Sequence, residues 1–278
     1  MQPLQTLPTA YRALVGIDMD GTLLSGNDTI SSANRDAIAN AITDGVAVAL
    51  ISGRTVCGMT KEAEALNLHT PCCGAGGAII FEPFSGKVLK HFPLSAVERD
   101  AVLQTIGDAP LTIFCHEYDA IYIQNGKTER VDSLRRRVSC SLVDMPDLQS
   151  HYKNIPSKIS LWGERDLLLS IRDQLAQSQP QLNCYMTAPD TLEISQRQAH
   201  KGWALRNIAE MLGVPQNHTI GIGDEQNDLE MLSAAAIGVA MGNANEELKN
   251  QADIIAPSNS EDGVAWVFNT VLPQLLQK

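Results

Sequence analysis

Strand and helix patterns alternate at both ends of this chain, and this alternation restricts the possible fold more than any other feature. Residues 13–17 and 46–51 are short apolar runs rich in branched side chains, as expected for strands buried on both faces. Residues 31–44, which separate them, carry apolar side chains at helical spacing, and a second helix is expected over residues 55–66. Strands and helices in this order, joined by short links, predict a parallel sheet with right-handed crossovers.

The alternation stops in the middle of the chain and returns after residue 191. The C-terminal part predicts helices over 202–212, 227–234, 244–252 and 264–276, and strands over 219–222, 237–240 and 254–255. The middle predicts a β-hairpin over 78–81 and 88–92, then strands over 111–115, 120–123 and 158–162 among helices over 95–106, 130–138 and 165–177. We therefore expect an α/β fold: a doubly wound, Rossmann-like parallel-sheet core, residues 1–82 and 191–278, with an inserted α+β cap domain, residues 83–190. The turn residues at 83–86 and 187–190 are the expected hinges of the insert.

Two carboxylates follow the first predicted strand directly. Asp18 and Asp20 lie two residues apart, so both can approach one ligand at the carboxyl end of the strand, where open α/β sheets bind their ligands. Gly21 lets the chain turn away without a side chain in the path of that ligand. Because two neighbouring anions repel, they favour a shared cation, and Mg²⁺ prefers oxygen ligands. Taken alone, the motif is equally compatible with an ordinary polar turn.

Further polar groups follow two other predicted strands. Ser52, Gly53 and Arg54 end the second strand, and the acidic segment 223–228 ends the strand over 219–222. Lys201 stands at the start of a helix, whose N-terminus favours anions. Three independent polar turns are a poor explanation for this set, which suits a bound metal ion and a phosphate.

Taken in order, these motifs resemble those of the haloacid dehalogenase (HAD) superfamily, and in particular its Cof-type phosphatases with a large cap of the second type (C2B). The resemblance covers nearly the whole core, whereas the cap resembles the family in length and placement more than in sequence. Its motifs in this chain are Asp18-x-Asp20-Gly21-Thr22, Ser52, Lys201, Gly223-Asp224-x-x-Asn227-Asp228 and the tail segments 252–253 and 262–264.

The resemblance implies a role for each motif residue. Asp18 would be the nucleophile that forms an aspartyl-phosphate, and Asp20 would protonate the leaving alcohol and then activate water. Ser52 and Lys201 would hold phosphoryl oxygens. Gly53, Arg54 and Asn227 are further candidates for substrate or phosphate binding, and Mg²⁺ would be bound by Asp18, the backbone carbonyl of Asp20, Asp224 and Asp228.

Some positions keep two interpretations. Gly76 stands where the family usually carries an asparagine, and the glycines of segment 74–78 favour a tight turn over a phosphate cradle. Arg54 either contacts substrate or braces the core through an ion pair. The basic run 135–137 favours a solvated helix face over recognition of an anionic substrate, and His200 is expected at the surface.

Composition excludes several classes of protein and partner. The chain has 278 residues, and its 21 basic and 32 acidic residues give a formal net charge of −11, which disfavours nucleic acid as a partner. No apolar run approaches the roughly 18 residues of a membrane helix, and the N-terminus lacks a signal-peptide pattern, so a cytoplasmic protein with no membrane partner is expected. The six cysteines lack metal-site spacing and are expected to be reduced packing residues, with Cys72 and Cys73 at a buried strand end.

The leading hypothesis is a Mg²⁺-dependent phosphatase that hydrolyses small phosphorylated metabolites, with sugar phosphates the favoured class. Two alternatives stay open: a phosphomutase with a similar cap, and a non-catalytic protein that binds phosphorylated metabolites. Two catalytic aspartates argue against a pure binder. The physiological substrate and the oligomeric state cannot be inferred from the sequence.

Overall fold

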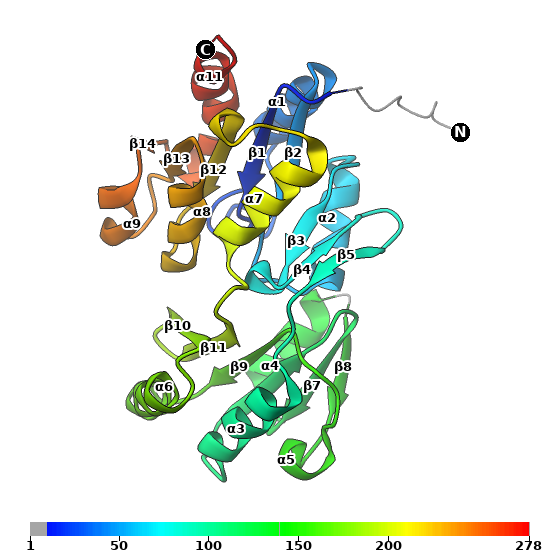
Figure 1. Ribbon diagram of the computed structural model, residues 1–278, viewed down its shortest axis with the longest axis vertical. Helices are drawn as coiled ribbons and strands as arrows, with labels where there is room; N and C mark the ends of the chain where they lie inside the picture. The colour runs from blue at the N-terminus through cyan, green and yellow to red at the C-terminus, as the bar shows by residue number, and fades with distance from the viewer. Residues whose placement is uncertain (1–9, 139, 278) are drawn as a thin grey trace.

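The computed structural model describes residues 10–138 and 140–277, which form two parts, each with its own sheet and helices, one above the other (Figure 1). The upper part is built on a five-stranded parallel sheet and the lower part on a six-stranded mixed sheet. We call them the core and the cap. The predicted fold class, a doubly wound parallel sheet with an inserted α+β cap, is confirmed.

The core sheet has the strand order β14-β13-β12-β1-β2, with β12 at its centre and β1 between β12 and β2. Its strands are β1 (Ala13–Ile17), β2 (Val46–Leu50), β12 (Thr219–Gly223), β13 (Ile237–Ala240) and β14 (Ile254–Ile255). Strands β1 and β2 are apolar and buried throughout, because helices cover both faces of the sheet.

Helices from distant parts of the chain cover the two faces of the core sheet. On one face, α1 (Ser32–Thr43) packs with the C-terminal α10 (Gly263–Trp266), a π-helical turn (Val267–Val271) and α11 (Leu272–Leu276). On the other lie α7 (Lys201–Leu212), α8 (Leu229–Ala234) and α9 (Glu246–Gln251). The Ser31 hydroxyl caps α1 by accepting a hydrogen bond from the Asn34 amide at 3.1 Å.

A small antiparallel sheet of β3 (Cys72–Gly74), β4 (Ile79–Phe81) and β5 (Val88–His91) extends the core beside β2. The predicted helix over 55–66 is divided into a short 3₁₀ turn, η1 (Val56–Gly58), and α2 (Thr60–Ala65). Segment 74–78 contains a 3₁₀ turn (Ala75–Gly77) between β3 and β4, so the expectation of a tight turn is confirmed.

The cap sheet has the order β10-β11-β9-β6-β7-β8. Helices α3 (Ala96–Ile106), α5 (Leu148–His151) and α6 (Arg165–Ser178) lie on its apolar face, and α4 (Glu129–Arg137) packs near the other. The strands are β6 (Thr112–His116), β7 (Ala120–Gln124), β8 (Ser141–Asp144), β9 (Lys158–Trp162), β10 (Leu182–Ala188) and β11 (Thr191–Gln196).

The crossings between core and cap differ from the expected ones. Strand β5 pairs with β4 in the core, and β11 pairs with β9 and β10 in the cap, so the boundaries at 82/83 and 190/191 do not match the sheets. Residues 83–87 and 189–190 are hairpin turns within the core and the cap, respectively, and the predicted hinges there are wrong. The chain crosses instead at 92–95 and 197–200, because turn residues serve hairpins and hinges equally.

A disulfide joins the two parts of the molecule. Cys57 of η1 is bonded to Cys140, which follows α4, with their Cα atoms 5.3 Å apart. The expectation that every cysteine is a reduced packing residue is therefore wrong for this pair, which is 83 positions apart and has no sequence signature. Cys72 and Cys73 are buried thiols on β3, as expected. Among the described residues, no helix has the length and apolar character needed to cross a membrane.

Candidate active site

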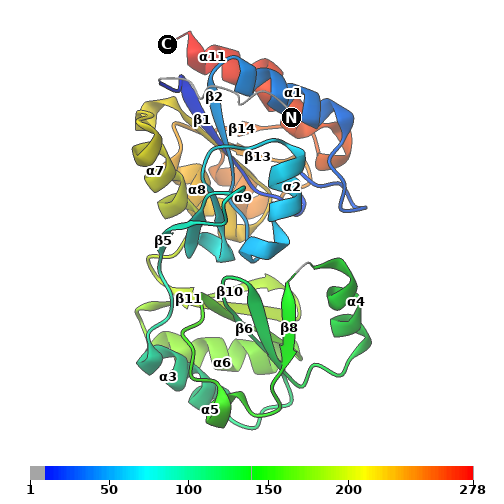
Figure 2. The same cartoon turned by 90° about the vertical axis from the view of Figure 1, so that its right-hand side faces the viewer.

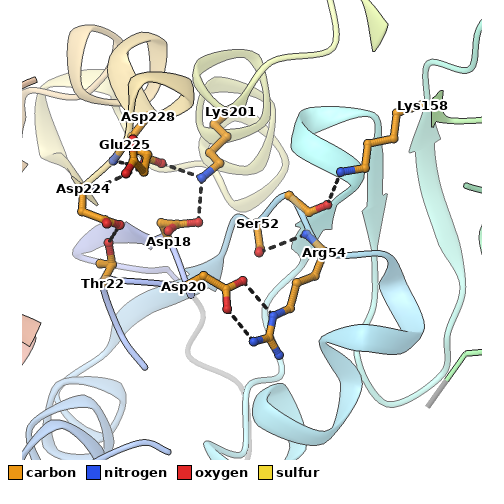
Figure 3. Close-up of polar contacts among 11 residues, drawn as sticks. Asp18, Asp20, Thr22, Ser52, Arg54, Lys158, Lys201, Asp224, Glu225 and Asp228 are labelled. Atoms are coloured by element: carbon orange, nitrogen blue, oxygen red, sulfur yellow. Dashed lines mark hydrogen bonds and ion pairs between the residues drawn. The ribbon is translucent and has the colours of Figure 1, made fainter. Parts of the chain in front are cut away.

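The carboxyl ends of three core strands bring the predicted residues to one edge of the sheet, below which lies the cap (Figures 1 and 3). Asp18 follows β1, Ser52 lies just beyond β2, and Asp224 follows β12. Lys201 is the first residue of α7 and is 1% exposed. The structure therefore places together residues that lie about 200 positions apart in the chain.

Lys201 joins two buried carboxylates. Its Nζ donates to Asp18 Oδ1 and to Asp228 Oδ1, both at 2.6 Å (Figure 3). Burial raises the pKa of Asp18 well above its ordinary value, and the carboxylates of Asp228 and Asp224 raise it further, against the lowering effect of Lys201. Burial alone would lower the pKa of Lys201, but the two carboxylates raise it, so the ammonium is retained. One cation thus faces three carboxylates.

Asp224 and Asp228 are held by different donors. Thr22 Oγ1 donates to Asp224 Oδ1 at 2.7 Å, and the main-chain amides of Asp224 and Glu225 each donate to Asp228 Oδ2 at 3.1 Å. Burial, together with the charge of Asp228, raises the pKa of Asp224 to about 7, although the Thr22 hydrogen bond opposes the shift.

Gly21 is required where the chain turns past Asp224. Its φ is +79°, and a Cβ atom there would stand 2.1 Å from Asp224 Oδ2. Both the left-handed backbone and this close approach exclude a larger residue. The turn expected at Gly21 is present, and the close approach to Asp224 adds a reason for glycine that the sequence did not indicate.

Asp20 does not join the other carboxylates. It is bound to Arg54 through two hydrogen bonds, Nε to Oδ2 at 2.8 Å and Nη2 to Oδ1 at 2.5 Å, and the Asp20 side chain is 57% exposed (Figure 3). Arg54 also reaches Asp28 at 3.4 Å. Of the two interpretations of Arg54, the structure contains the ion pair.

The remaining predicted binding residues face the same space. Ser52 Oγ accepts from the Arg54 amide at 3.2 Å, and the Gly53 carbonyl accepts from Lys158 of the cap at 2.8 Å. Asn227 Oδ1 is buried and has no hydrogen-bond partner among residues 10–138 and 140–277. Ser52, Gly53, Arg54 and Asn227 all line the cavity described below.

Three carboxylates meet the requirements of a cation site. Asp18, Asp224 and Asp228 are buried, and each offers an oxygen within 4.8 Å of the others. These are hard oxygen donors, and burial, together with the neighbouring carboxylates, raises the pKa values of Asp18 and Asp224. The sequence placed Asp20 among the metal ligands through its backbone carbonyl only. Its carboxylate is bound to Arg54.

A cavity of about 770 Å³ lies between core and cap. Its core side contains Asp18, Ser52 and Lys201, and its cap side contains residues that no motif indicated: Phe114, His116, Arg130, Lys158, Ser160, Trp162 and Glu193. The strand over 158–162 was predicted, and alternation along it groups Lys158, Ser160 and Trp162 on one face, but it does not show that this face meets the core.

Three secondary expectations have outcomes here. Gly76 has φ +71°, as suits the turn, and no atom lies within 4 Å of the position that a Cβ atom would take. In the basic run, Arg135 pairs with Asp144 and Arg136 is an exposed residue at the cavity, so the run is only partly a solvated face. His200 is not a surface residue: it is half-buried and caps α7, accepting from the Trp203 amide at 3.3 Å, and burial lowers its pKa.

Comparison with known proteins identifies this arrangement. A family model described as haloacid dehalogenase-like hydrolase matches residues 15–268. The chain belongs to the haloacid dehalogenase-like hydrolases. A solved structure of a haloacid dehalogenase-like hydrolase from Bacteroides thetaiotaomicron superposes with a TM-score of 0.83 at 26% identity, covering 94% of this chain and 99% of that one.

Several curated relatives of this chain are named phosphatases. Phosphatase YwpJ of Bacillus subtilis is 30% identical, over 93% of this chain and 99% of its own length. The 5-amino-6-(5-phospho-D-ribitylamino)uracil phosphatase YitU of the same organism is 27% identical, over 91% of this chain and 94% of its own. The expectation of an enzyme, a phosphatase of the haloacid dehalogenase type, is confirmed.

Proposed function

We propose that this enzyme is a Mg²⁺-dependent phosphatase that hydrolyses small phosphorylated metabolites through an aspartyl-phosphate. The observation that carries the proposal is Asp18, buried at the floor of the cavity between Lys201 and two further carboxylates. A nucleophilic carboxylate needs a phosphoryl group brought next to it, and this cavity is closed on the opposite side by the cap. We also propose that the core is the catalytic domain and the cap the specificity domain.

Asp18, Asp224 and Asp228 would hold Mg²⁺, with the backbone carbonyl of Asp20 as a further ligand. When bound, the ion would neutralise charge on the phosphate and on the carboxylates. Lys201 supplies the positive charge that belongs to the protein itself, and its bond to Asp18 orients that carboxylate. The Ser52 hydroxyl would donate a hydrogen bond to a phosphoryl oxygen.

The chemistry has two steps on Asp18. A carboxylate oxygen of Asp18 attacks phosphorus while the bond from phosphorus to the leaving-group oxygen breaks, and Asp20 donates its proton to that oxygen. Asp20 then takes a proton from water, whose oxygen attacks phosphorus and displaces Asp18. The products are the alcohol and inorganic phosphate, and both aspartates return to their starting states.

Asp20 must leave Arg54 to act as the acid. While both of its oxygens accept from the guanidinium, neither is free to carry a proton to a leaving group. We infer that Asp20 separates from Arg54 when substrate enters the cavity. Because this ion pair is partly exposed to solvent, breaking it costs little free energy.

A sugar or polyol phosphate is the proposed substrate class. The relative YitU is named for a substrate that carries a phosphorylated ribityl chain, and the two proteins align over almost their whole length. A phosphomutase would form an isomer and a binding protein would form no product, so a simple assay separates both from a phosphatase.

The test is release of phosphate from an aryl phosphate and from a sugar phosphate panel, with and without Mg²⁺. We expect Mg²⁺-dependent phosphate release, and phosphoenzyme trapped by rapid acid quenching in the wild type but absent in Asp18→Asn. Isomer formation without phosphate release would support the mutase, and absence of turnover with every substrate would support the binding protein. Turnover of Asp18→Asn within tenfold of wild type would contradict the nucleophile assignment.

A further inference from the structure

The cap sheet presents a polar face to the core. Along β6 and β9, every second side chain packs in the apolar cluster beneath α3 and α6. The side chains between them line the cavity: Phe114, His116, Lys158, Ser160 and Trp162. Strand pairing sets His116 opposite Lys158 and Phe114 opposite Ser160, so these residues form one continuous wall.

This wall contains most of the unpaired buried polar atoms of the described chain. Within residues 10–138 and 140–277, four buried side-chain atoms have no hydrogen-bond partner: both ring nitrogens of His116, Ser160 Oγ and Asn227 Oδ1. All three residues line the same cavity, and Ser160 is only 4% exposed. Folded proteins rarely leave buried polar groups unpaired, because each one loses its hydrogen bonds to water. Their common position points to a bound molecule.

The charged groups of the same wall are already paired. Lys158 Nζ bonds to Glu193 Oε1 at 2.5 Å, and Arg130 pairs with Asp190 and stacks on the Trp162 ring with its guanidinium carbon 3.9 Å from the ring centre. Burial and the nearby Lys158 lower the pKa of His116 well below its ordinary value, so one ring nitrogen donates and the other accepts. The available hydrogen-bonding capacity of the wall is therefore neutral and of both kinds.

We propose that His116 and Ser160 determine leaving-group specificity by binding an uncharged, polyhydroxylated group. A hydroxyl both donates and accepts, which matches the His116 nitrogens and Ser160 Oγ, while Phe114 and Trp162 offer apolar surface to its C–H groups. Among the described residues of this sheet face, no cation is left unpaired to meet a second phosphate or a carboxylate. Arg136, which also lines the cavity, belongs to α4 and not to this face. The inference rests on the proposed phosphatase function, because it assigns the group that the phosphoryl transfer releases.

Three substrates test it: a five-carbon polyol phosphate, pentyl phosphate of the same length without hydroxyls, and an aryl phosphate. We expect the wild-type kcat/KM to favour the polyol phosphate over pentyl phosphate by at least about tenfold. Ser160→Ala should reduce this ratio about 3- to 10-fold, the loss of one neutral hydrogen bond, and His116→Ala should reduce it further. His151→Ala and Ser170→Ala, at exposed cap positions, are the matched controls and should keep the wild-type ratio.

Several outcomes would overturn the assignment. One is an unchanged ratio in Ser160→Ala, which removes a single atom and is the variant least able to unfold; another is a wild-type preference for a sugar-acid phosphate or a bisphosphate. If the aryl phosphate is not hydrolysed at all, the proposed function fails, and calorimetric binding of the polyol phosphate decides the subsite separately. Weaker binding to Ser160→Ala would then support the subsite, and equal binding would contradict it.

A second observation, independent of the first, concerns the disulfide. Cys57 lies three residues beyond Arg54 at the cavity, and its partner Cys140 follows α4. Figure 2 shows α4 on one side of the molecule and, on the opposite side, the two segments that run from β5 to α3 and from β11 to α7. The cap is thus attached to the core by two chain crossings on one side and by a covalent bond on the other.

We further infer that the Cys57–Cys140 pair is a redox latch on the same proposed active site. When oxidised it holds the cap closed and prevents the opening that admits substrate and releases product; when reduced it permits opening. Glutathione disulfide is the class of oxidant proposed. One cysteine thiolate attacks it, forming a mixed disulfide and releasing one glutathione thiolate, and the second cysteine displaces the other, so two electrons and two protons pass from the pair to two glutathione molecules.

The test compares protein equilibrated with reduced and with oxidised glutathione, with the bond followed by peptide mass mapping. We expect aryl phosphate turnover at least about tenfold lower in the oxidised protein, and no such dependence in Cys57→Ser or Cys140→Ser. Cys184→Ser, which removes a half-buried free thiol, is the matched control and should remain sensitive. The substrate panel above is accordingly assayed on reduced protein.

Equal turnover of both forms, or a pair that stays reduced under oxidised glutathione, would overturn the latch. If no aryl phosphate is hydrolysed by either form, hydrogen exchange at the crossings 92–95 and 197–200 decides the matter. Slower exchange in the oxidised protein would support the latch, and identical exchange would contradict it.

Discussion

At the scale of single residues, the site is held together by an excess of negative charge. Lys201 supplies one positive charge against three buried carboxylates, and the pKa values of Asp18 and Asp224 are raised first by burial and then by the neighbouring carboxylates. A phosphate dianion entering this space would meet repulsion unless further positive charge arrived with it. The demand for a divalent cation is therefore a consequence of the protein's own charges.

Asp224→Asn should raise the Mg²⁺ concentration needed for half-maximal activity by about tenfold or more, because one anionic ligand is lost while the Thr22 contact is kept. The measurement is the rate of aryl phosphate hydrolysis over a Mg²⁺ titration. Asp36→Asn, an exposed position on α1, serves as the control for charge alone. An unchanged Mg²⁺ requirement would remove Asp224 from the proposed metal site.

Asp20→Asn should lower kcat by about 10²- to 10⁴-fold, since the amide neither donates the proton nor activates water. With an aryl phosphate, whose leaving group needs little protonation, hydrolysis of the intermediate becomes the slow step. Phosphoenzyme should then accumulate, and rapid quenching with labelled substrate measures it. A variant that loses activity without accumulating phosphoenzyme would contradict the second role of Asp20.

The sequence was sufficient to predict that Asp18, Lys201 and Asp224 lie close together. Each stands at the end of a strand or the start of a helix, and the place of these points in a parallel sheet is fixed. It did not indicate the Asp20–Arg54 pair, since either side chain could reach several partners. It also did not indicate His116 or Ser160. Nothing in an alternating strand marks which face meets a cavity until the cap is placed over the core.

At the scale of elements, strands with strong apolar runs were predicted and polar ones were missed. Strand β8 is largely exposed at a sheet edge, and β10 has mostly half-buried residues, so neither carries a continuous apolar signal. Because β11 was not predicted, the expected boundary between cap and core at 190/191 falls within the cap sheet. Pairing with distant strands, more than local preference, makes these segments strands.

Helix α7 carries Lys201 and depends on close contact with α8. A Cβ atom at Gly202 would stand 2.0 Å from the Glu230 carbonyl oxygen, so Gly202→Ala must separate the two helices. We expect a loss of about 1–3 kcal/mol in the free energy of unfolding and a fall in kcat, because Lys201 moves with its helix. Denaturant unfolding and steady-state kinetics measure both. Gly26→Ala, with no atom within 4 Å of its Cβ, should change neither, and a neutral Gly202→Ala would show that the helices can adjust.

At the scale of the whole molecule, the core and the cap have separate apolar interiors. The clusters around the core sheet and those around the cap sheet share no residue, which agrees with the proposed division into two domains. The Lys158–Gly53 contact and the disulfide connect them across the cavity. Each therefore has the interior that an independent folding unit requires.

Replacing residues 96–196 by a short flexible linker should leave a folded core that hydrolyses aryl phosphate while its preference among sugar phosphates is lost. The reason is that the proposed catalytic groups lie in the core and the proposed leaving-group wall lies in the cap. Solubility and circular dichroism establish folding first, since new apolar surface is exposed. A soluble core with the wild-type order of substrate preference would place specificity outside the cap.

The position of β1 between β2 and β12 has a consequence for how the protein is made on the ribosome. Leu14 pairs with Ala47 on one side and with Thr219 on the other, so one edge of β1 has no partner until more than 200 further residues have been translated. At roughly 5–20 residues per second, that interval lasts about 10–40 s. All strands of the cap sheet, which end at Gln196, are translated within this interval. Nascent chains arrested before Thr219 should therefore contain a protease-resistant cap attached to an unprotected N-terminal segment. Such an open strand edge is a site for aggregation, and the growing chain is most vulnerable there.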